Sequence, residues 1–201
     1  MFIKLFLIFI LILNLIVVPY TENKSRLILK NSNIDFLPTL ISEKKFINIF
    51  KNIFEHSDFI THEVEGLRPF QNKLDVIDSF IKVFDNLTMD VKIKIIKSHP
   101  DLGDKIKIVE GLTEFSQQEQ SGAGLANCNE EEYRKFHKLN DEFKAKFDIP
   151  FIFAIRGKSK SDIFKEFETR LKSDNIEQEL DKSINQVKKI ATLRLNEIIH
   201  E

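Results

Sequence analysis

The sequence is poor in residues that mark several common classes of protein. Its 201 residues include one cysteine, Cys128, so no disulfide can form within the chain. Thirty basic residues face 31 acidic ones, and this balance gives nucleic-acid binding no electrostatic support. Tryptophan is absent, whereas phenylalanine occurs 19 times, so we expect a phenylalanine-rich core.

A recognisable metal motif is also missing. His62-Glu63 begins like the zinc motif H-E-x-x-H, but Gly66 stands where the second histidine would be. We therefore predict that His56 and His62 are surface or capping residues, and we predict no metal site.

The longest hydrophobic run lies at the N-terminus. Residues 5–18 are apolar except for Asn14 and follow Lys4, an arrangement typical of a signal peptide. The run is short for a membrane span, which needs about 20 residues, and residues 17–20 lack a small-x-small cleavage site. An uncleaved membrane anchor, an unusual export signal and an unrelated extension all fit residues 1–20. Residues 21–41 are predicted to form a linker.

Residues 42–201 are predicted to form a single compact all-α domain of several helices. Phe46, Ile49, Phe50, Ile53 and Phe54 follow the spacing of an amphipathic helix. Residues with capping side chains place later helix starts at Thr88, Ser116, Asn129, Ser161 and Asp174. For the apolar run 149–155, both a buried strand and an extended segment crossing the core fit.

One stretch with chemical potential begins where a helix must end. Pro100 cannot continue the helix that Thr88 starts, so His99 is predicted at its C-terminus with the ring pointing off the end. That position favours the protonated imidazole and brings its pKa toward physiological pH. A solvated or capping histidine fits as well, and Asp101 fits either an acid partner of His99 or a turn.

A second stretch combines Ser116, Glu119 and Gln120 with a patch of glycine and alanine. Ser116 and Glu119 have the capping-box spacing, which predicts a helix start at Ser116. Gly122 and Gly124 would each cost about 1 kcal/mol in a helix. That cost favours a close approach by another helix or by a small ligand.

Together these motifs resemble the OHCU decarboxylase family, where OHCU is 2-oxo-4-hydroxy-4-carboxy-5-ureidoimidazoline. The resemblance covers about residues 46–199 and rests, in order, on His99-Pro100-Asp101-Leu102, Ser116-x-x-Glu119-Gln120-x-x-Ala123-Gly124-Leu125 and Ile149-Pro150-Phe151-Ile152 leading to Arg156-Gly157. It implies an all-α carboxy-lyase that converts OHCU, an intermediate of urate breakdown, to (S)-allantoin without a metal or an organic cofactor. It also implies a small-molecule substrate, a homodimer, and a cytosolic or peroxisomal location.

The resemblance suggests roles for individual residues. His99 would be the general acid or base, and Glu119 would orient His99 or hold the ureido nitrogens of the substrate. An arginine in the position of Arg194 usually snorkels, but Arg194 matches a substrate-binding arginine of the family, with Arg170 as a weaker candidate. The other predicted substrate-binding residues are Pro100, Ser116, Gln120, Phe151, Ile152, Ala154 and Ile155.

Two other functional classes remain open at this point. One is a helical binding protein whose site has lost its activity, and it predicts no turnover by folded protein. The other is a membrane-tethered interaction protein that uses residues 1–20, and it predicts loss of function when that segment is removed.

Overall fold

The computed structural model describes residues 37–103 and 112–199, and within these ranges every regular element is a helix. The all-α prediction is thereby confirmed, while the segment 1–20 and most of the predicted linker lie outside the described residues. The elements are α2 (Leu37–Leu40), α3 (Glu43–Phe50), α4 (Phe59–Glu65), α5 (Lys73–Asn86), α6 (Met89–Lys97), α7 (Glu114–Gly122), the 3-10 helix η1 (Leu125–Asn127), α8 (Glu130–Phe147), α9 (Lys160–Arg170) and α10 (Ile176–Ile198).

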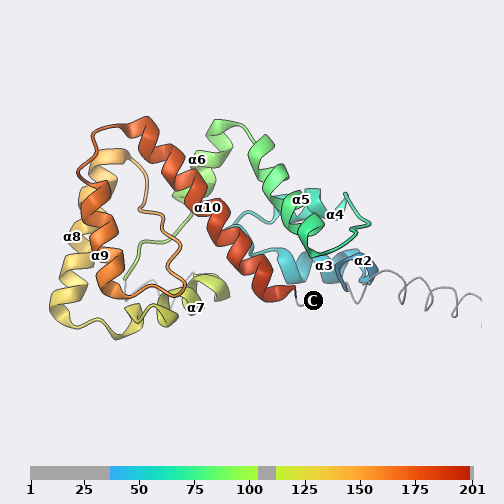
Figure 1. Ribbon diagram of the computed structural model, residues 1–201, viewed down its shortest axis with the longest axis horizontal. Coiled ribbons are helices and arrows are strands. Elements are labelled where there is room, and N and C mark those ends of the chain that lie inside the picture. Colours follow the sequence, from blue (N-terminus) through green and yellow to red (C-terminus); the bar gives the residue numbers. More distant parts are fainter. Residues whose placement is uncertain (1–36, 104–111, 200–201) are drawn as a thin grey trace, which may run out of the picture.

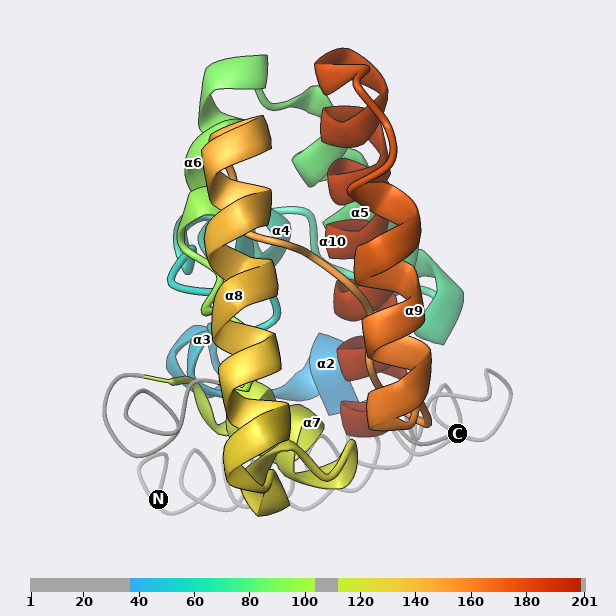
Figure 2. The ribbon, with the colours of Figure 1, turned by 90° about the vertical axis from the view of Figure 1, so that its left-hand side faces the viewer.

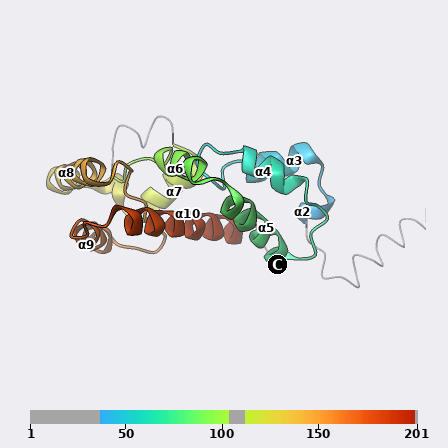
Figure 3. The ribbon, with the colours of Figure 1, turned by 90° about the horizontal axis from the view of Figure 1, so that it is seen from above.

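The helices form an elongated molecule built on α10. Seen from above, α8, α6 and α4 form one row, α9, α10 and α5 form the other, and α7 lies between the rows (Figure 3). Helix α10 runs from the end occupied by α8 and α9 toward the end occupied by α2 and α3 (Figure 1), and it packs against α5, α6 and α8. Helices α8 and α9 lie side by side at their end of the molecule (Figure 2). No helix in the described ranges combines the length and the apolar character that a membrane span requires.

The expected phenylalanine core is present, and within this one core the rings contact each other in two groups. One joins rings from α3, α5 and the loops beside them, namely Phe46, Phe50, Phe54, Phe70, Phe80 and Phe84. The other joins rings from α8, α9 and the chain between them, namely Phe136, Phe143, Phe147, Phe151 and Phe167. Helix α3 ends at Phe50, yet the next members of its apolar stripe, Ile53 and Phe54, are buried in the turns that follow.

The start of α7 differs from the prediction. The N-cap is Thr113, whose side chain accepts a hydrogen bond from the backbone N–H of Ser116, and the helix begins at Glu114. Ser116 therefore lies in the first turn of α7 rather than capping it. Its hydroxyl is free to point into the protein, and this matters for the site.

The other capping residues lie at or near the predicted positions. Asn129 forms the predicted capping box of α8. Helix α9 is capped by Ser159, two residues before the predicted Ser161, and α10 by Asn175, one residue after the predicted Asp174. In each case the N-cap is a nearby residue whose side chain is equally suited to capping. The sequence pattern alone therefore could not decide which of the two residues caps the helix.

The apolar run between α8 and α9 is an extended segment, as the second interpretation predicted. Residues 149–155 form no strand. The guanidinium of Arg170 donates to the carbonyl oxygen of Ile152 at 2.5 Å and is itself ion-paired with Glu179. This buried pair anchors the segment against α9 and α10, so Arg170, the weaker substrate-binding candidate, has a structural position.

Candidate active site

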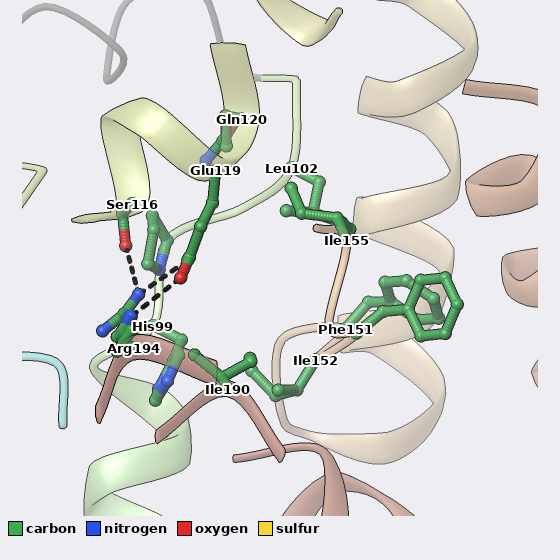
Figure 4. Close-up of a pocket in the computed structure, with 12 residues that line it drawn as sticks. His99, Leu102, Ser116, Glu119, Gln120, Phe151, Ile152, Ile155, Ile190 and Arg194 are labelled. Carbon is green, nitrogen blue, oxygen red and sulfur yellow. Dashed lines mark hydrogen bonds and ion pairs between the residues drawn. The ribbon is translucent and has the colours of Figure 1, made fainter. Parts of the chain in front are cut away.

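A pocket opens where the end of α6, α7, the extended segment and α10 meet. It encloses about 350 Å³ of empty space, including the part that is open to solvent. Polar residues lie on one side and apolar residues on the other (Figure 4). Its lining comprises His99, Pro100, Leu102, Ser116, Glu119, Gln120, Phe151, Ile152, Phe153, Ile155, Ile190 and Arg194.

The structure brings together all but one of the site residues predicted from the sequence. The exception is Ala154, which is buried behind the lining and donates its backbone N–H to Gln186. Three lining residues were not predicted: Leu102, Phe153 and Ile190. The sequence could have indicated two of them. Leu102 is the last residue of the His-Pro-Asp-Leu motif, and Ile190 precedes Arg194 by one turn of α10 and so lies on the same helix face.

Arg194 lies at the centre of the polar side. Its Nε donates to Oε1 of Glu119 at 2.9 Å, and its Nη2 donates to Oε2 at 2.8 Å, a bidentate pair (Figure 4). The side chain is only 1% exposed. The snorkelling that is usual for an arginine at such a position does not occur here, because the charged end of Arg194 turns inward to a carboxylate.

The other face of the Arg194 guanidinium meets Glu55, which sequence reasoning missed. The Glu55 carboxylate is fully buried and accepts from Arg194 Nη1 at 3.2 Å, from Ser116 Oγ at 2.8 Å and from Thr113 Oγ1 at 2.9 Å. Burial raises the pKa of Glu55, but the charge of Arg194 and the hydroxyl of Ser116 outweigh it and leave the pKa below its usual value. In the sequence, the only feature that marks Glu55 is its position directly after the apolar stripe that begins in α3.

The donors of Arg194 are consequently engaged by the protein. Nη1 also lies 3.1 Å from the carbonyl oxygen of Asn52, and Nη2 donates to Ser116 Oγ at 3.1 Å. Each of the three guanidinium nitrogens thus has an acceptor. In this structure the bidentate partner of the Arg194 guanidinium is Glu119.

Gln120 is also engaged. Its Oε1 accepts from the backbone N–H of Gly103 at 3.1 Å, and its Nε2 donates to the carbonyl oxygen of Asp101 at 3.3 Å. Gln120 therefore shapes the loop that follows His99. Asp101 itself is ion-paired with Lys144 at 2.8 Å, which accounts for its carboxylate without His99.

His99 differs from its predicted state. The ring is half-buried, and its Nδ1 lies 2.8 Å from the carbonyl oxygen of Ile95. Because a carbonyl only accepts, Nδ1 carries the proton and Nε2 keeps a lone pair in the neutral ring. Burial, assisted by the charge of Arg194 and opposed by the Ile95 bond, lowers the pKa of His99 to about 4. The expected shift toward a protonated ring is wrong, because desolvation exceeds the effect of the helix end.

The site thus presents a neutral imidazole and the carboxylate of Glu119, paired with Arg194, beside an apolar wall. Glu119 is the partner of Arg194 that lines the pocket, and its Oε1 lies 3.8 Å from Nη2 of Arg156. Such a pair can move a proton and bind N–H groups of a small polar ligand. His56 and His62 are exposed, as predicted, and the described residues contain no group of three potential ligands that could hold a metal ion.

Comparisons with known proteins place this geometry in a family. The family model of OHCU decarboxylase matches residues 40–196. The OHCU decarboxylase of Xenopus laevis is 32% identical over 155 residues, covering 77% of this chain and 88% of that protein. The uric acid degradation bifunctional protein of Bacillus sp. (strain TB-90) is 34% identical over 161 residues, covering 80% of this chain but 31% of that protein. The chain therefore spans about a third of the length of this bifunctional relative.

Solved structures share the fold. A crystal structure of OHCU decarboxylase in the presence of (S)-allantoin superposes with a TM-score of 0.60 at 18% identity, covering 74% of this chain and 96% of that one. A crystal structure of (S)-allantoin synthase gives a TM-score of 0.60 at 20% identity, covering 81% of this chain and 52% of that one. At these identities the likeness concerns the arrangement of the helices.

Proposed function

The chain belongs to the OHCU decarboxylase family, and on that premise we propose that it decarboxylates OHCU to (S)-allantoin in urate degradation. The observation that carries the proposal is the convergence of a neutral His99 and the Glu119–Arg194 pair on one small pocket. We further propose that the reaction needs no metal and no organic cofactor.

The substrate itself can take up the electron pair that decarboxylation releases. In OHCU an imine carbon adjoins the carbon that carries the carboxylate and the hydroxyl. When the bond to the carboxylate breaks, its electrons form a double bond to that neighbour, and the imine electrons move to nitrogen, which takes a proton from water. Carbon dioxide leaves, and the hydroxyl-bearing carbon then becomes the carbonyl of allantoin as its neighbour gains a proton on one face.

His99 is proposed to transfer that proton. A histidine with a pKa of about 4 is neutral at pH 7, so it first acts as a base. The proton it accepts is the one that the substrate hydroxyl must lose in becoming a carbonyl. The imidazolium then returns the proton to the neighbouring carbon, and because His99 lies on one side of the pocket, only one enantiomer forms.

Glu119 and Arg194 are proposed to hold the substrate. Glu119 would accept hydrogen bonds from the ureido N–H groups, with Arg194 fixing the direction of its carboxylate. Since the donors of Arg194 are engaged, we propose that it acts on substrate oxygens through its charge rather than through a bidentate grip. Ser116 and Gln120 would chiefly hold the network and the loop that position these groups.

The apolar wall has a proposed role in the bond cleavage. Phe151, Ile152, Ile155 and Ile190 face the polar groups across the pocket (Figure 4). A carboxylate placed there loses hydration, whereas neutral carbon dioxide does not need it, and this difference favours cleavage.

We also propose a homodimer and a cytosolic or peroxisomal location, as in the family.

A turnover assay tests the proposal. OHCU is generated in place from urate by the two upstream activities, and its loss is compared with the spontaneous decay. The full chain should accelerate the loss, and His99→Ala should lower the rate by about 10²–10⁴-fold, whereas the exposed control His62→Ala should not. A chain lacking residues 1–20 should keep its activity. An unaccelerated loss with folded protein would refute the proposed function and favour a binding protein with a decayed site.

A further inference from the structure

We propose that Glu55 is the positioning residue of this site, holding Arg194, the start of α7 and the end of α6 in one arrangement and thereby aiming Glu119 and His99 at the substrate. The inference deepens the proposed decarboxylase function and rests on it. Glu55 does not line the pocket, so it would act through its neighbours.

The side chain of Glu55 joins two elements that are far apart in the sequence. Thr113, the N-cap of α7, directs its hydroxyl to both carboxylate oxygens at 2.9 Å and its backbone N–H to Oε1 at 3.3 Å. Arg194, on α10, reaches Oε2 at 3.2 Å. Ser116 closes the triangle, since its Oγ donates to Glu55 and accepts from Arg194. The register of α7, which carries Glu119, is thus tied to the guanidinium that pairs with Glu119.

The backbone of Glu55 reaches the third element. Its carbonyl oxygen lies 3.0 Å from Ser98 Oγ, which shares its one proton between this carbonyl and that of Ile95 at 2.7 Å, and Ser98 is the C-cap of α6 immediately before His99. The same carbonyl accepts from Ser57 Oγ at 2.9 Å. One residue therefore contacts both the helix end that precedes His99 and the helix that carries Glu119.

The charges explain why a second carboxylate is needed. Arg194 lies between Glu55, which is 0% exposed, and Glu119, whose side chain is 11% exposed and faces the pocket. Glu55 holds the guanidinium from behind, so Glu119 does not have to fix it alone and stays available to a ligand. Without the inner carboxylate, Arg194 would keep only one ionic partner, and its position would depend on the group that must also bind substrate.

Another buried pair shows what a structural carboxylate looks like in this chain. Glu179 is also fully buried and paired with an arginine, Arg170, but their bonds run to α9, α10 and the carbonyl of Ile152. They touch neither α7 nor the end of α6. Among the buried carboxylates of the described residues, Glu55 joins the elements on the polar side of the pocket.

The test compares Glu55→Gln with the wild type and with Thr61→Val. Thr61 is 1% exposed, and its hydroxyl donates to the carbonyl oxygen of Phe50 at 2.9 Å. Thr61→Val therefore also removes a buried hydrogen bond, but one that joins no element of the site. The first measurement is the solvent exchange of the Arg194 Nε–H by NMR. We expect slow exchange in the wild type and in Thr61→Val, and exchange at least about tenfold faster in Glu55→Gln, because the guanidinium loses its inner partner.

The second measurement is the kinetic pair kcat and KM for OHCU. Because Glu55 aims His99, which transfers the proton, as well as Glu119, which holds the substrate, Glu55→Gln should lower kcat by about 10- to 100-fold and raise KM by a smaller factor. Glu55→Asp, which keeps the charge on a shorter side chain, should recover part of kcat. Thr61→Val should leave both constants near the wild-type values.

The outcomes separate the two claims. Should the wild type not turn over OHCU, the proposed function fails, and the Arg194 exchange alone decides the role of Glu55. Unchanged exchange and unchanged kcat in folded Glu55→Gln would overturn the positioning role. If Glu55→Gln does not fold, Thr113→Val, which removes one hydroxyl bond to Glu55, decides in its place: faster Arg194 exchange than in Thr61→Val supports the role, and equal exchange overturns it.

Discussion

Replacing His99 with glutamine should remove a specific part of the pH dependence of stability. The pKa of His99 falls from its usual value of 6.5 to about 4 on folding. Between these pH values the unfolded chain binds a proton that the folded protein does not, so the free energy of unfolding rises with pH across this window. A difference of 2.5 pKa units corresponds to about 3 kcal/mol. This stabilisation is complete above pH 6.5 and is lost as the pH falls toward 4.

Urea unfolding at intervals between pH 4.5 and 7.5 measures this effect. The free energy of unfolding of the wild type minus that of His99→Gln should stay constant above pH 6.5 and fall below it, by up to about 1.4 kcal/mol per pH unit. Subtracting the variant removes the contribution of surface carboxylates, which both proteins share. NMR titration of the His99 ring provides a direct control on the folded protein. A ring that titrates near 6.5, with equal pH slopes in both proteins, would refute the lowered pKa of His99 and the desolvation that causes it.

Further predictions concern activity and stability. The acid limb of kcat/KM should lie near pH 4 rather than near 6.5, because His99 must be neutral; a limb near 6.5 in a pH–rate profile would contradict this. Ser116→Ala should lower the free energy of unfolding by about 1–3 kcal/mol, because it leaves two charged partners short of a bond, whereas Ser121→Ala, exposed on the same helix, should not; equal values in urea unfolding would contradict the network. Gly103→Ala should lower the free energy of unfolding more than Gly157→Ala in the same assay. Both glycines have positive φ, so both substitutions strain the backbone. The added Cβ at Gly103 would also lie 2.7 Å from a phenylalanine ring of α8, whereas at Gly157 it meets open space. A similar loss at both positions would contradict this packing.

The sequence was informative where local rules decide the structure. Pro100 ends α6, so His99 lies after the end of that helix as predicted. The capping box at Asn129 follows from two residues three positions apart. The resemblance to the family predicted that His99, Glu119 and Arg194 share one site. Residues that match a family's motifs come together when the chain adopts that family's fold.

What the sequence could not provide depends on contacts between distant residues. Glu55 gains its importance from partners 58 to 139 positions away, and no local pattern marks it. The protonation of His99 depends on how much water the packed helices exclude, which outweighs the helix-end effect that sequence reasoning applied. The engagement of Arg194 depends on two carboxylates that approach it from different elements.

The measurement that tests the central claim most directly is the circular dichroism of the product. With OHCU generated in place, the account predicts a rapid build-up of the (S)-allantoin signal with the wild type, and its loss in His99→Ala. Slow formation of racemic allantoin at the uncatalysed rate, from wild-type protein shown to be folded, would contradict the claim that this pocket delivers a proton to one face of the substrate.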